Sequence, residues 1–345
     1  MIRPFDLRDT KLVTYLQQVG TPLDIEEQLT HPRSPLWAVL MNSVLAPRAG
    51  PSTFILDQQD ENGRLLGLAQ VRLRPGRPER DVVFMAPALG VGNGGTHAIW
   101  QRLLTYLCVQ AAEKGCLSLY ASLPVDSDEF QLFKTIGFTE YCQEDVYRLA
   151  PDPQRLPAQP GLTLRRQEAG DGWGLQKLYA TLTPRLVQNA EGLAQGMWAL
   201  DRHNWAEPGR HEGYVWETGG ELLGALHIHR GKRGFWVRTL LHPDAIDQAR
   251  PLAEAALRLT IAKNPEIPVY FAVRQYAAGW SATLTDLGFE PFTSQTLVVK
   301  PMTVRLFDRS PMLLPVLEKS PSETAPAISR AKLVKRRTVS SKGQS

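Results

Sequence analysis

Residues 129–138 read EFQLFKTIGF, a short stretch that joins a predicted helix to a predicted strand. The helix is expected over Asp126–Ile136, and Gly137 ends it, because glycine readily takes the left-handed conformation that follows a last helical turn. The chain then returns as a strand over Phe138–Leu149. The same unit occurs a second time as LTDLGF at residues 284–289, which precedes another largely apolar strand.

A second pair of blocks shows that the two copies are about one domain apart. The block ENGRLLG at residues 61–67 is a turn followed by an apolar strand, and its counterpart is ETGGELLG at residues 217–224. Between the copies, residues 151–160 hold four prolines, which favour an extended linker over a helix or a central strand. The chain is therefore expected to form an N-terminal domain over 1–150, this linker, and a C-terminal domain over 161–306.

Strands and helices alternate within each half. In the N-terminal half, two apolar runs flank the turn at residues 62–63, which is a strong hairpin signal, and a further strand is expected over Asp81–Ala86. Ile99, Leu103 and Leu107 recur every fourth residue in the clearest helix of the chain. The second half repeats this order. The pattern predicts the α/β (α+β) class, with two tandem domains that each have a mixed, mostly antiparallel sheet flanked by helices.

This element order, together with the Gly-Phe blocks, resembles the GNAT superfamily of N-acetyltransferases, present twice in tandem. The best match is residues 129–138 followed by residues 147–149, YRL, which resemble the family's helix ending in "lYeklGF" and its strand closing near "yrL". The resemblance covers about residues 1–149 and 161–306, and the second copy is weaker. It implies transfer of an acetyl group from acetyl-CoA to an amine, carried by a small molecule or a peptide.

The resemblance also implies where acetyl-CoA binds. In the family, a loop and a helix N-terminus present backbone N–H groups to the pyrophosphate, in the pattern R/Q-x-x-G-x-G/A. The first copy has GTHAIW at residues 95–100, where Trp100 is bulky, and the second has IDQARP at residues 246–251, which holds no glycine. At most one acetyl-CoA per chain is therefore expected, in the first half. Its implied binding residues are Phe84, Met85, Ala86, Gly94, Gly95, Thr96, His97 and Ala98.

A glycine-rich stretch, GVGNGG at residues 90–95, precedes the same helix and matches G-x-G-x-x-G. The element order is wrong for a dinucleotide-binding unit, which needs an early strand–helix–strand and a later acid. Two interpretations stay open. The stretch is either a nest of backbone N–H groups for a phosphate or a spacer that lengthens the loop.

The family's catalytic residues are poorly represented. The position of the usual acid, a tyrosine four residues before the glycine of the Gly-Phe block, holds Phe133 in one copy and Leu284 in the other, and neither can donate a proton. The usual base is a carboxylate on or near the strand before the cofactor loop. Asp81 is a weak candidate for it, and a solvated strand end is the alternative interpretation. Tyr141 and Tyr147 could reach a cleft from the last strand of this half, or pack within the sheet.

No metal site is predicted. His227 and His229 project from one face of a strand and His242 ends the next, but no obvious fourth ligand joins them. The three cysteines of the chain form no CxxC pair, and such a sparse set indicates a reducing compartment. The preferred interpretation is that these histidines are exposed or hydrogen-bonded residues of the sheet and bind no metal.

The net charge of +4 is concentrated at the C-terminal end. Residues 328–345 carry six basic side chains and no acidic ones, so the rest of the chain is nearly neutral and nucleic acid is not an expected partner. Residues 307–345 are expected to be a disordered basic tail. The chain has neither a membrane-length apolar run nor an apolar signal core, so the cytoplasm is the expected location and no membrane is an expected partner.

Two functional hypotheses follow. The leading one is an acyltransferase of the N-acetyltransferase type, in which backbone donors along Phe84–Ala86 assist attack by a neutral amine and the proton leaves through water. The alternative is a catalytically inactive GNAT-fold module that binds a metabolite or a partner. Trp100, Phe133, Leu284 and residues 246–251 favour the alternative, whereas the family resemblance favours the first. The sequence indicates neither the acceptor nor the oligomeric state.

Overall fold

The computed structural model describes residues 1–44, 52–60, 63–74, 76–90, 95–152, 154, 161–192, 210–277 and 279–302. Met1–Val304 form one compact unit, and Arg305–Ser345 form a second unit that lies outside the described residues. The predicted basic tail, Gly94 and most of the predicted linker therefore also lie outside them. None of the helices in the described ranges is long and apolar enough to cross a membrane.

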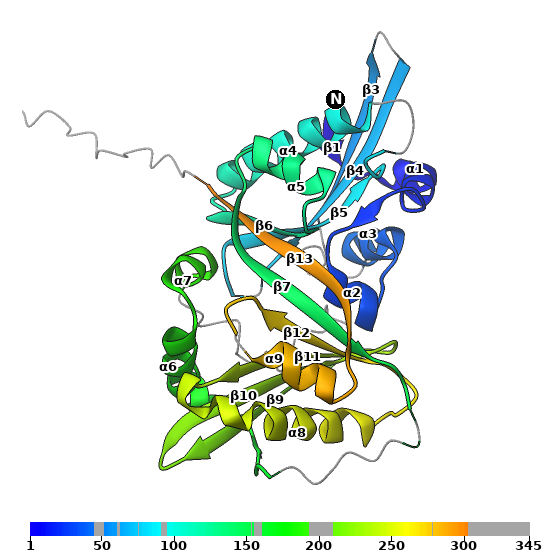
Figure 1. Ribbon diagram of the computed structural model, residues 1–345. Helices are drawn as coiled ribbons and strands as arrows, with labels where there is room; N and C mark the ends of the chain where they lie inside the picture. Colours follow the sequence, from blue (N-terminus) through cyan, green and yellow to red (C-terminus); the bar gives the residue numbers. More distant parts are fainter. Residues whose placement is uncertain are drawn as a thin grey trace, which may run out of the picture. The chain divides into compact units, whose positions relative to one another are not determined.

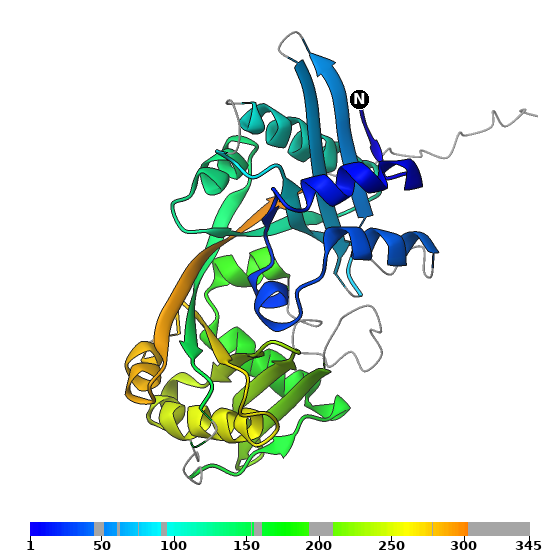
Figure 2. The same ribbon diagram turned by 90° about the vertical axis from the view of Figure 1, so that its right-hand side faces the viewer.

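The N-terminal half contains five α-helices and seven strands among its described residues. They are β1 (Ile2–Pro4), α1 (Thr10–Leu16), β2 (Thr21–Pro22), α2 (Ile25–Thr30), α3 (Pro35–Val44), β3 (Ser52–Asp60), β4 (Gly63–Leu73), β5 (Glu79–Ala86), α4 (Thr96–Glu113), β6 (Ser118–Pro124), α5 (Asp128–Thr135) and β7 (Thr139–Leu149). The second half begins with β8 (Arg165–Arg166). Figure 2 shows α4 on one face of β3, β4 and β5, and α1 and α3 on the other.

The C-terminal half repeats this arrangement. Its remaining elements are α6 (Gly172–Leu182), α7 (Arg185–Glu191), β9 (Arg210–Thr218), β10 (Glu221–Arg230), β11 (Phe235–Leu241), α8 (Ala249–Ile261), β12 (Val269–Arg274), α9 (Trp280–Asp286) and β13 (Glu290–Pro301). The predicted α/β class with a mostly antiparallel sheet is confirmed.

The helix α5, which begins the first Gly-Phe unit, is stabilised by its own cap and by the glycine that follows it. The side chain of Ser127 accepts a hydrogen bond from the backbone N–H of Phe130, which caps the first turn of α5. Gly137 follows the helix with a φ of 92°, a conformation that side chains with a Cβ rarely adopt. Gly288 has a φ of 81° after α9. The repeated Gly-Phe block is therefore a repeated helix stop.

The two halves share one continuous sheet, which the sequence analysis did not predict. Its strand order is β1-β3-β4-β5-β6-β13-β7-β12-β11-β10-β9-β8, and β2 pairs with β5. The last strand of each half is inserted into the other half: β13 lies between β6 and β7, and β7 lies between β13 and β12. Leu297 of β13, for example, is opposite Ser122 in β6 and Cys142 in β7. Figure 1 shows β7 and β13 side by side between the two halves.

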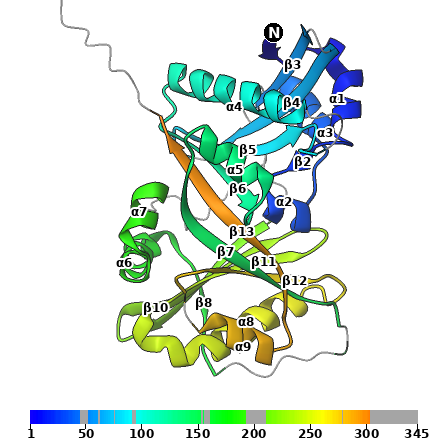
Figure 3. The same ribbon diagram turned by 45° about the horizontal axis from the view of Figure 1, so that its top comes forward.

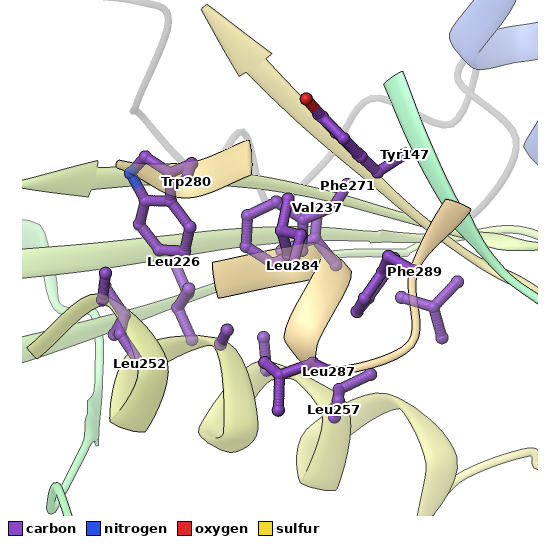
Figure 4. Packing of buried hydrophobic residues seen from close by; sticks show 14 of the residues in the cluster. Tyr147, Leu226, Val237, Leu252, Leu257, Phe271, Trp280, Leu284, Leu287 and Phe289 are labelled. Carbon is purple, nitrogen blue, oxygen red and sulfur yellow. The ribbon is translucent and has the colours of Figure 1, made fainter. Parts of the chain in front are cut away.

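The exchanged strands also contribute side chains to both apolar cores. Val298 of β13 is fully buried in the core of the N-terminal half, beneath α4. Tyr147 and Leu149 of β7 are buried in the core of the C-terminal half, beside α8 and α9. Figure 4 shows Tyr147 in this cluster with Phe271 and Phe289. Each half is therefore completed by the final strand of the other.

Candidate functional site

The two parallel strand pairs of the sheet diverge after a few residues. β5 and β6 pair over Glu79–Asp81 and Ser118–Tyr120, and β11 and β12 pair over Phe235–Arg238 and Val269–Ala272. Beyond these residues, the described parts of β5 and β11 have no partner in β6 and β12. Each half thus has an opening in the sheet at the same point of its fold.

A β-bulge marks the opening in the N-terminal half. Phe84 is opposite Gln70 and Val82 is opposite Val71, so Val83 is an extra residue without a partner in the fully described strand β4. A bulge leaves its extra residue outside the ladder and re-aims the backbone there. The equivalent strand β11 pairs with β10 in unbroken register from Phe235 to Leu241. The bulge therefore distinguishes the two openings.

A cavity of about 200 Å³, which we call the central cavity, lies at the opening of the N-terminal half. Val83 and Asp81 of β5 line it, with Tyr141 of β7 and Gln295 of β13. Residues of β11 and β12 also reach it, so both halves form its wall. Its charged lining residues are Asp24, Glu26, Asp81, Glu144, Arg72, Arg74, Arg238 and Arg274.

Every arginine that lines the central cavity contacts a carboxylate. The contacts are Arg72 Nη1 to Glu27 Oε2 (2.8 Å), Arg74 Nη2 to Asp81 Oδ1 (2.7 Å), Arg238 Nη1 to Glu26 Oε2 (2.7 Å) and Arg274 Nε to Glu144 Oε2 (2.9 Å). Such pairing is what allows charges to lie inside a protein at all. The cavity wall is therefore a set of ion pairs, in which Arg238 Nε and Arg274 Nη1 are buried with no hydrogen-bond partner among the described residues.

The opening in the C-terminal half is filled by side chains. The cavity there measures about 30 Å³ and is lined by Tyr179, Tyr276 and Leu240, among others. The hydroxyl of Tyr179 donates a 2.6 Å hydrogen bond to Glu191, which also lies 3.2 Å from Arg274. Burial raises the pKa of Tyr276 to about 12. Two protonated tyrosines and a buried ion pair thus occupy the space that stays open in the other half.

A short strand covers the edge of β5 in the N-terminal opening. Thr21 and Pro22 of β2 pair with Met85 and Phe84, and the N–H of Leu23 donates to the carbonyl of Val83 at 2.8 Å. β4 occupies the other edge of β5. Figure 3 shows β2 beside β5. At Phe84 and Met85, the backbone of β5 therefore has a strand on each edge, β2 on one and β4 on the other.

The helix α2, which follows β2, is held against the C-terminal half. Glu26 contacts Arg238 at 2.7 Å and His229 Nδ1 at 2.9 Å. Burial alone would raise the pKa of Glu26, but Arg238 and His229 lower it far below its usual range. His211 stacks on His229 with 4.2 Å between ring centroids and on His227 with 5.3 Å. The described part of the chain holds no group of three or more His, Cys, Asp or Glu residues that could bind a metal ion.

Similarity to known proteins is found in the structure and not in the sequence. No family model matches the chain, and no curated protein matches it. Among solved structures, a tandem GNAT protein from the clavulanic acid biosynthesis pathway is 16% identical, with a TM-score of 0.51 over 88% of this chain and 98% of that one. A GCN5-related N-acetyltransferase from Sphaerobacter thermophilus is 13% identical, with a TM-score of 0.51 over 88% and 95%.

The chain has a tandem GNAT-like fold. At these identities the likeness concerns the fold alone, and function has to be argued from the residues.

The residues that the GNAT-like resemblance assigned to acetyl-CoA lie around the opening but differ in exposure. Phe84 and Ala86 point into the apolar cluster with α1, and Met85 is buried in the core on the opposite face. Gly95 precedes α4 without a side-chain cap, Thr96 is buried, and His97 and Ala98 are exposed in the first turn. Gly94 lies outside the described residues.

Trp100 has a structural position in this GNAT-like fold. Its indole is fully buried in the N-terminal core, edge-on to Phe133, and its Nε1 donates a 2.6 Å hydrogen bond to the carbonyl of Pro87. The side chain therefore lies beneath the loop that follows β5, where it anchors the start of that loop to α4.

The candidate positions for the catalytic acid and base lie partly in the cores and partly at the central cavity. Phe133 and Leu284 are fully buried in the two cores. Asp81 lines the central cavity, and Tyr141 does so too, whereas Tyr147 belongs to the C-terminal core. Burial raises the pKa of Tyr141, so this hydroxyl keeps its proton and can donate a hydrogen bond.

Sequence reasoning missed Val83, Arg238 and Arg274. A bulge depends on the register of two strands, and the two arginines reach the cavity only because the halves exchange strands. In the sequence alone, neither Arg238 nor Arg274 shows that it lies near the N-terminal opening.

Proposed function

We propose that this protein binds a small polar ligand in the central cavity and is a binding module rather than an acetyltransferase. The observation that carries the proposal is the pairing of β2 with Phe84 and Met85 beside an open polar cavity. A backbone segment with neighbours on both edges has no N–H groups left for a second partner. Acetyl-CoA therefore does not fit along this part of β5 while β2 is in place.

The walls of the central cavity support a binding role. Ion pairs such as Arg74–Asp81 and Arg274–Glu144 fix the lining side chains before a ligand enters. A site whose side chains are already ordered loses less conformational entropy when it binds. A concave site with a few convergent polar groups is also where small ligands usually bind.

A second candidate function is the N-acetyltransferase reaction, and two observations favour it. The bulge leaves Val83, which lines the central cavity, without a partner in β4. The first turn of α4 has no side-chain cap, so the N–H groups of Thr96, His97 and Ala98 remain suited to a phosphate. Bound acetyl-CoA would supply an activated acetyl group. This function requires β2 to leave β5, with at most one cofactor per chain and Asp81 beside the acceptor amine.

Calorimetric titration of the full-length chain with acetyl-CoA, joined to an assay for released thiol with a pool of amines, separates the two candidates. The binding proposal expects no saturable heat up to about 1 mM acetyl-CoA and no thiol release. Saturable binding of one acetyl-CoA per chain together with thiol release would instead establish the acetyltransferase. Binding without release would make acetyl-CoA itself the ligand of the module.

A glycine variant locates any acetyl-CoA that binds. Among the described residues, a Cβ at Gly95 would come within 4 Å of Leu65 alone, at 3.8 Å, so this part of the fold has room for Gly95→Val, and the new side chain would lie at the N-terminal end of α4. Loss of binding in this variant would place the pyrophosphate at α4. Gly161→Val is the matched control and should leave any binding unchanged, because Gly161 is exposed and a Cβ there would meet no atom of the described residues within 4 Å.

A further inference from the structure

We infer that the ligand of the central cavity is a small neutral polyol, recognised through hydroxyl groups that both donate and accept hydrogen bonds. This inference rests on the proposed binding function of the cavity and names the chemical class of its ligand. It follows from the balance of charge in the wall and from the mixture of unpaired donors and acceptors there.

The charged side chains that line the central cavity balance one another. Four arginines and four carboxylates form its charged lining. A ligand with a net charge would add an excess charge to this balanced set, and a buried charge without a partner is costly. The wall is nevertheless rich in polar groups, so it suits a ligand that is polar and uncharged.

The two arginines from the C-terminal half present unpaired donors beside three carboxylates. Arg238 contacts Glu26 at 2.7 Å. Arg274 lies between Glu144 at 2.9 Å and Glu191 at 3.2 Å. Arg238 Nε and Arg274 Nη1 are still buried without a hydrogen-bond partner among the described residues. An anion at these donors would be a fourth negative charge beside two positive ones, whereas a hydroxyl oxygen accepts the same bonds and adds no charge.

Asp81 presents an unpaired acceptor on the other side of the cavity. Arg74 donates to Asp81 Oδ1 from both Nε (3.0 Å) and Nη2 (2.7 Å), and none of the described residues donates a hydrogen bond to Oδ2. Arg72, directly opposite Asp81 in the ladder of β4 and β5, is a second positive neighbour. Because two guanidinium groups already balance this carboxylate, its free oxygen suits the O–H of a neutral ligand.

The uncharged polar groups of the wall favour the same ligand. Ser122 and Tyr141 bring hydroxyl groups to the cavity, and the amide of Gln295 donates to Glu144 at 2.7 Å. None of the described residues forms a hydrogen bond with the hydroxyl of Tyr141. Donors and acceptors thus alternate around the cavity, and a chain of hydroxylated carbons can meet both kinds with each oxygen.

The size of the central cavity limits the length of this chain. Its volume of about 200 Å³ corresponds to about seven volumes of roughly 30 Å³, the share of one liquid water. A four-carbon polyol is of this size.

Four compounds with the same four-carbon chain test the inference. Erythritol is neutral and has a hydroxyl on every carbon, erythronate is its anionic acid, and 1-amino-1-deoxyerythritol is its cationic amine. The fourth compound, 1,4-butanediol, is neutral but lacks the two inner hydroxyls. We expect saturation-transfer NMR on the full-length chain, without acetyl-CoA, to show erythritol binding at least tenfold more tightly than each of the other three. Equal or tighter binding of any of these, or no saturation by erythritol below about 10 mM, would overturn the inference.

A matched pair of variants on β7 places the polyol in the central cavity. Tyr141→Phe removes one hydroxyl from the wall, and we expect it to weaken erythritol binding about fivefold, the usual effect of one lost hydrogen bond. Tyr147→Phe makes the same change in the C-terminal core, outside the cavity, and should leave binding unchanged. Erythritol binding that is equal in both variants and the unaltered protein would show that Tyr141 does not contact the polyol and would overturn this placement.

The ranking of the four compounds on the unaltered protein decides the ligand class even if Tyr141→Phe fails to fold. The outcome is also separable from the proposed function. Acetyl-CoA turnover would refute the binding module and leave the ranking intact, whereas preferred binding of erythronate or of the amine would refute this inference and leave the module intact.

Discussion

The two halves of the molecule close the same opening in different ways. In the N-terminal half, the backbone of β2 covers the edge of β5, and the space beside it remains a polar cavity. In the C-terminal half, Tyr179 and Tyr276 fill the space between β11 and β12. A two-residue ladder can separate at the cost of a few hydrogen bonds, whereas packed side chains leave a void when they move. We therefore expect the N-terminal closure to open at a lower cost in free energy than the C-terminal one.

The comparison also explains why the polar cavity lies in one half. The bulge at Val83 turns β5 at the opening, and β11 has no equivalent break in its pairing with β10. The C-terminal half supplies Arg238 and Arg274 to the cavity of the other half. The two halves therefore differ at this point: the N-terminal half holds the cavity, and the C-terminal half contributes Arg238 and Arg274 to its wall.

Separating the halves should have the largest effect. We propose that neither residues 1–150 nor residues 161–306 fold alone, because Val298 completes one core and Tyr147 the other. Each fragment, examined by circular dichroism and urea titration, should lack the cooperative unfolding of the full chain. Mixing the two fragments should restore it. Cooperative unfolding of either fragment alone would show that the exchanged strands are dispensable.

The closure of the N-terminal opening can be broken at Gly20. A Cβ at this position would lie 2.3 Å from the Phe84 ring, so Gly20→Val has to push β2 and β5 apart. Overpacking of this kind costs about 2 kcal/mol of unfolding free energy. The amide hydrogens of Leu23 and Ala88, which bond to Val83 and Val19, should also exchange faster.

The control for Gly20→Val is Gly161→Val, since no atom in the described part of the chain lies within 4 Å of a Cβ at that exposed glycine. Wild-type exchange rates at Leu23 in the Gly20 variant would contradict the close contact of β2 with β5. If the variant gains acetyl-CoA binding, the β2 ladder is what excludes the cofactor.

Much of this fold could be predicted from local sequence signals. Gly137 and Gly288 follow their helices with positive φ, as the two Gly-Phe blocks indicated, and the four-residue spacing of Ile99, Leu103 and Leu107 forms the buried face of α4. These signals act within a few residues of one another. A single sequence is sufficient to find them because each depends on one residue's conformational freedom or on one helical face.

The site depends on contacts that no local signal encodes. The exchange of β7 and β13 joins positions about 150 residues apart, such as Gln295 and Glu144, and only this exchange brings Arg274 to the cavity. The pairing of β2 with Met85 involves two residues, Thr21 and Pro22, for which the sequence analysis predicted no strand. Asp81 lies near the opening and lines the central cavity, but its catalytic role and the cofactor-binding roles along β5 stay predictions.

The packing of α2 on the C-terminal sheet should make stability depend on pH. Burial, with His211 beside it, lowers the pKa of His227 to about 3, against about 6.5 for an exposed histidine in the unfolded chain. Between these values the unfolded state binds one more proton, so stability falls as pH drops below about 6.5, by about 1.4 kcal/mol per pH unit. Urea titrations at pH 7 and 5.5 should show this loss.

Two histidine variants sharpen the pH result. His227→Gln cannot be protonated and should lose about 1 kcal/mol less between the two pH values than the unaltered protein does. His97→Gln, at an exposed position in the first turn of α4, should keep the full pH dependence. A pH dependence that His227→Gln leaves unchanged would assign the effect to other groups of the interface between α2 and the sheet.

The smallest expected effect concerns the start of the helical segment that follows each opening. In the N-terminal half, Gly95 offers no side-chain cap to α4. In the C-terminal half, His242 Nδ1 accepts a 3.2 Å hydrogen bond from the N–H of Asp244 and so caps the 3-10 helix over Pro243–Gln248. His242→Ala should therefore cost about 0.5 kcal/mol of unfolding free energy, and His242→Asn, which can still accept the bond, should cost less. Urea midpoints of both variants equal to that of the unaltered protein would mean that the cap contributes nothing to stability. The N–H groups at the start of this C-terminal segment would then be as open to an anion as those of α4, apart from the acidic Asp244 and Asp247 within the segment.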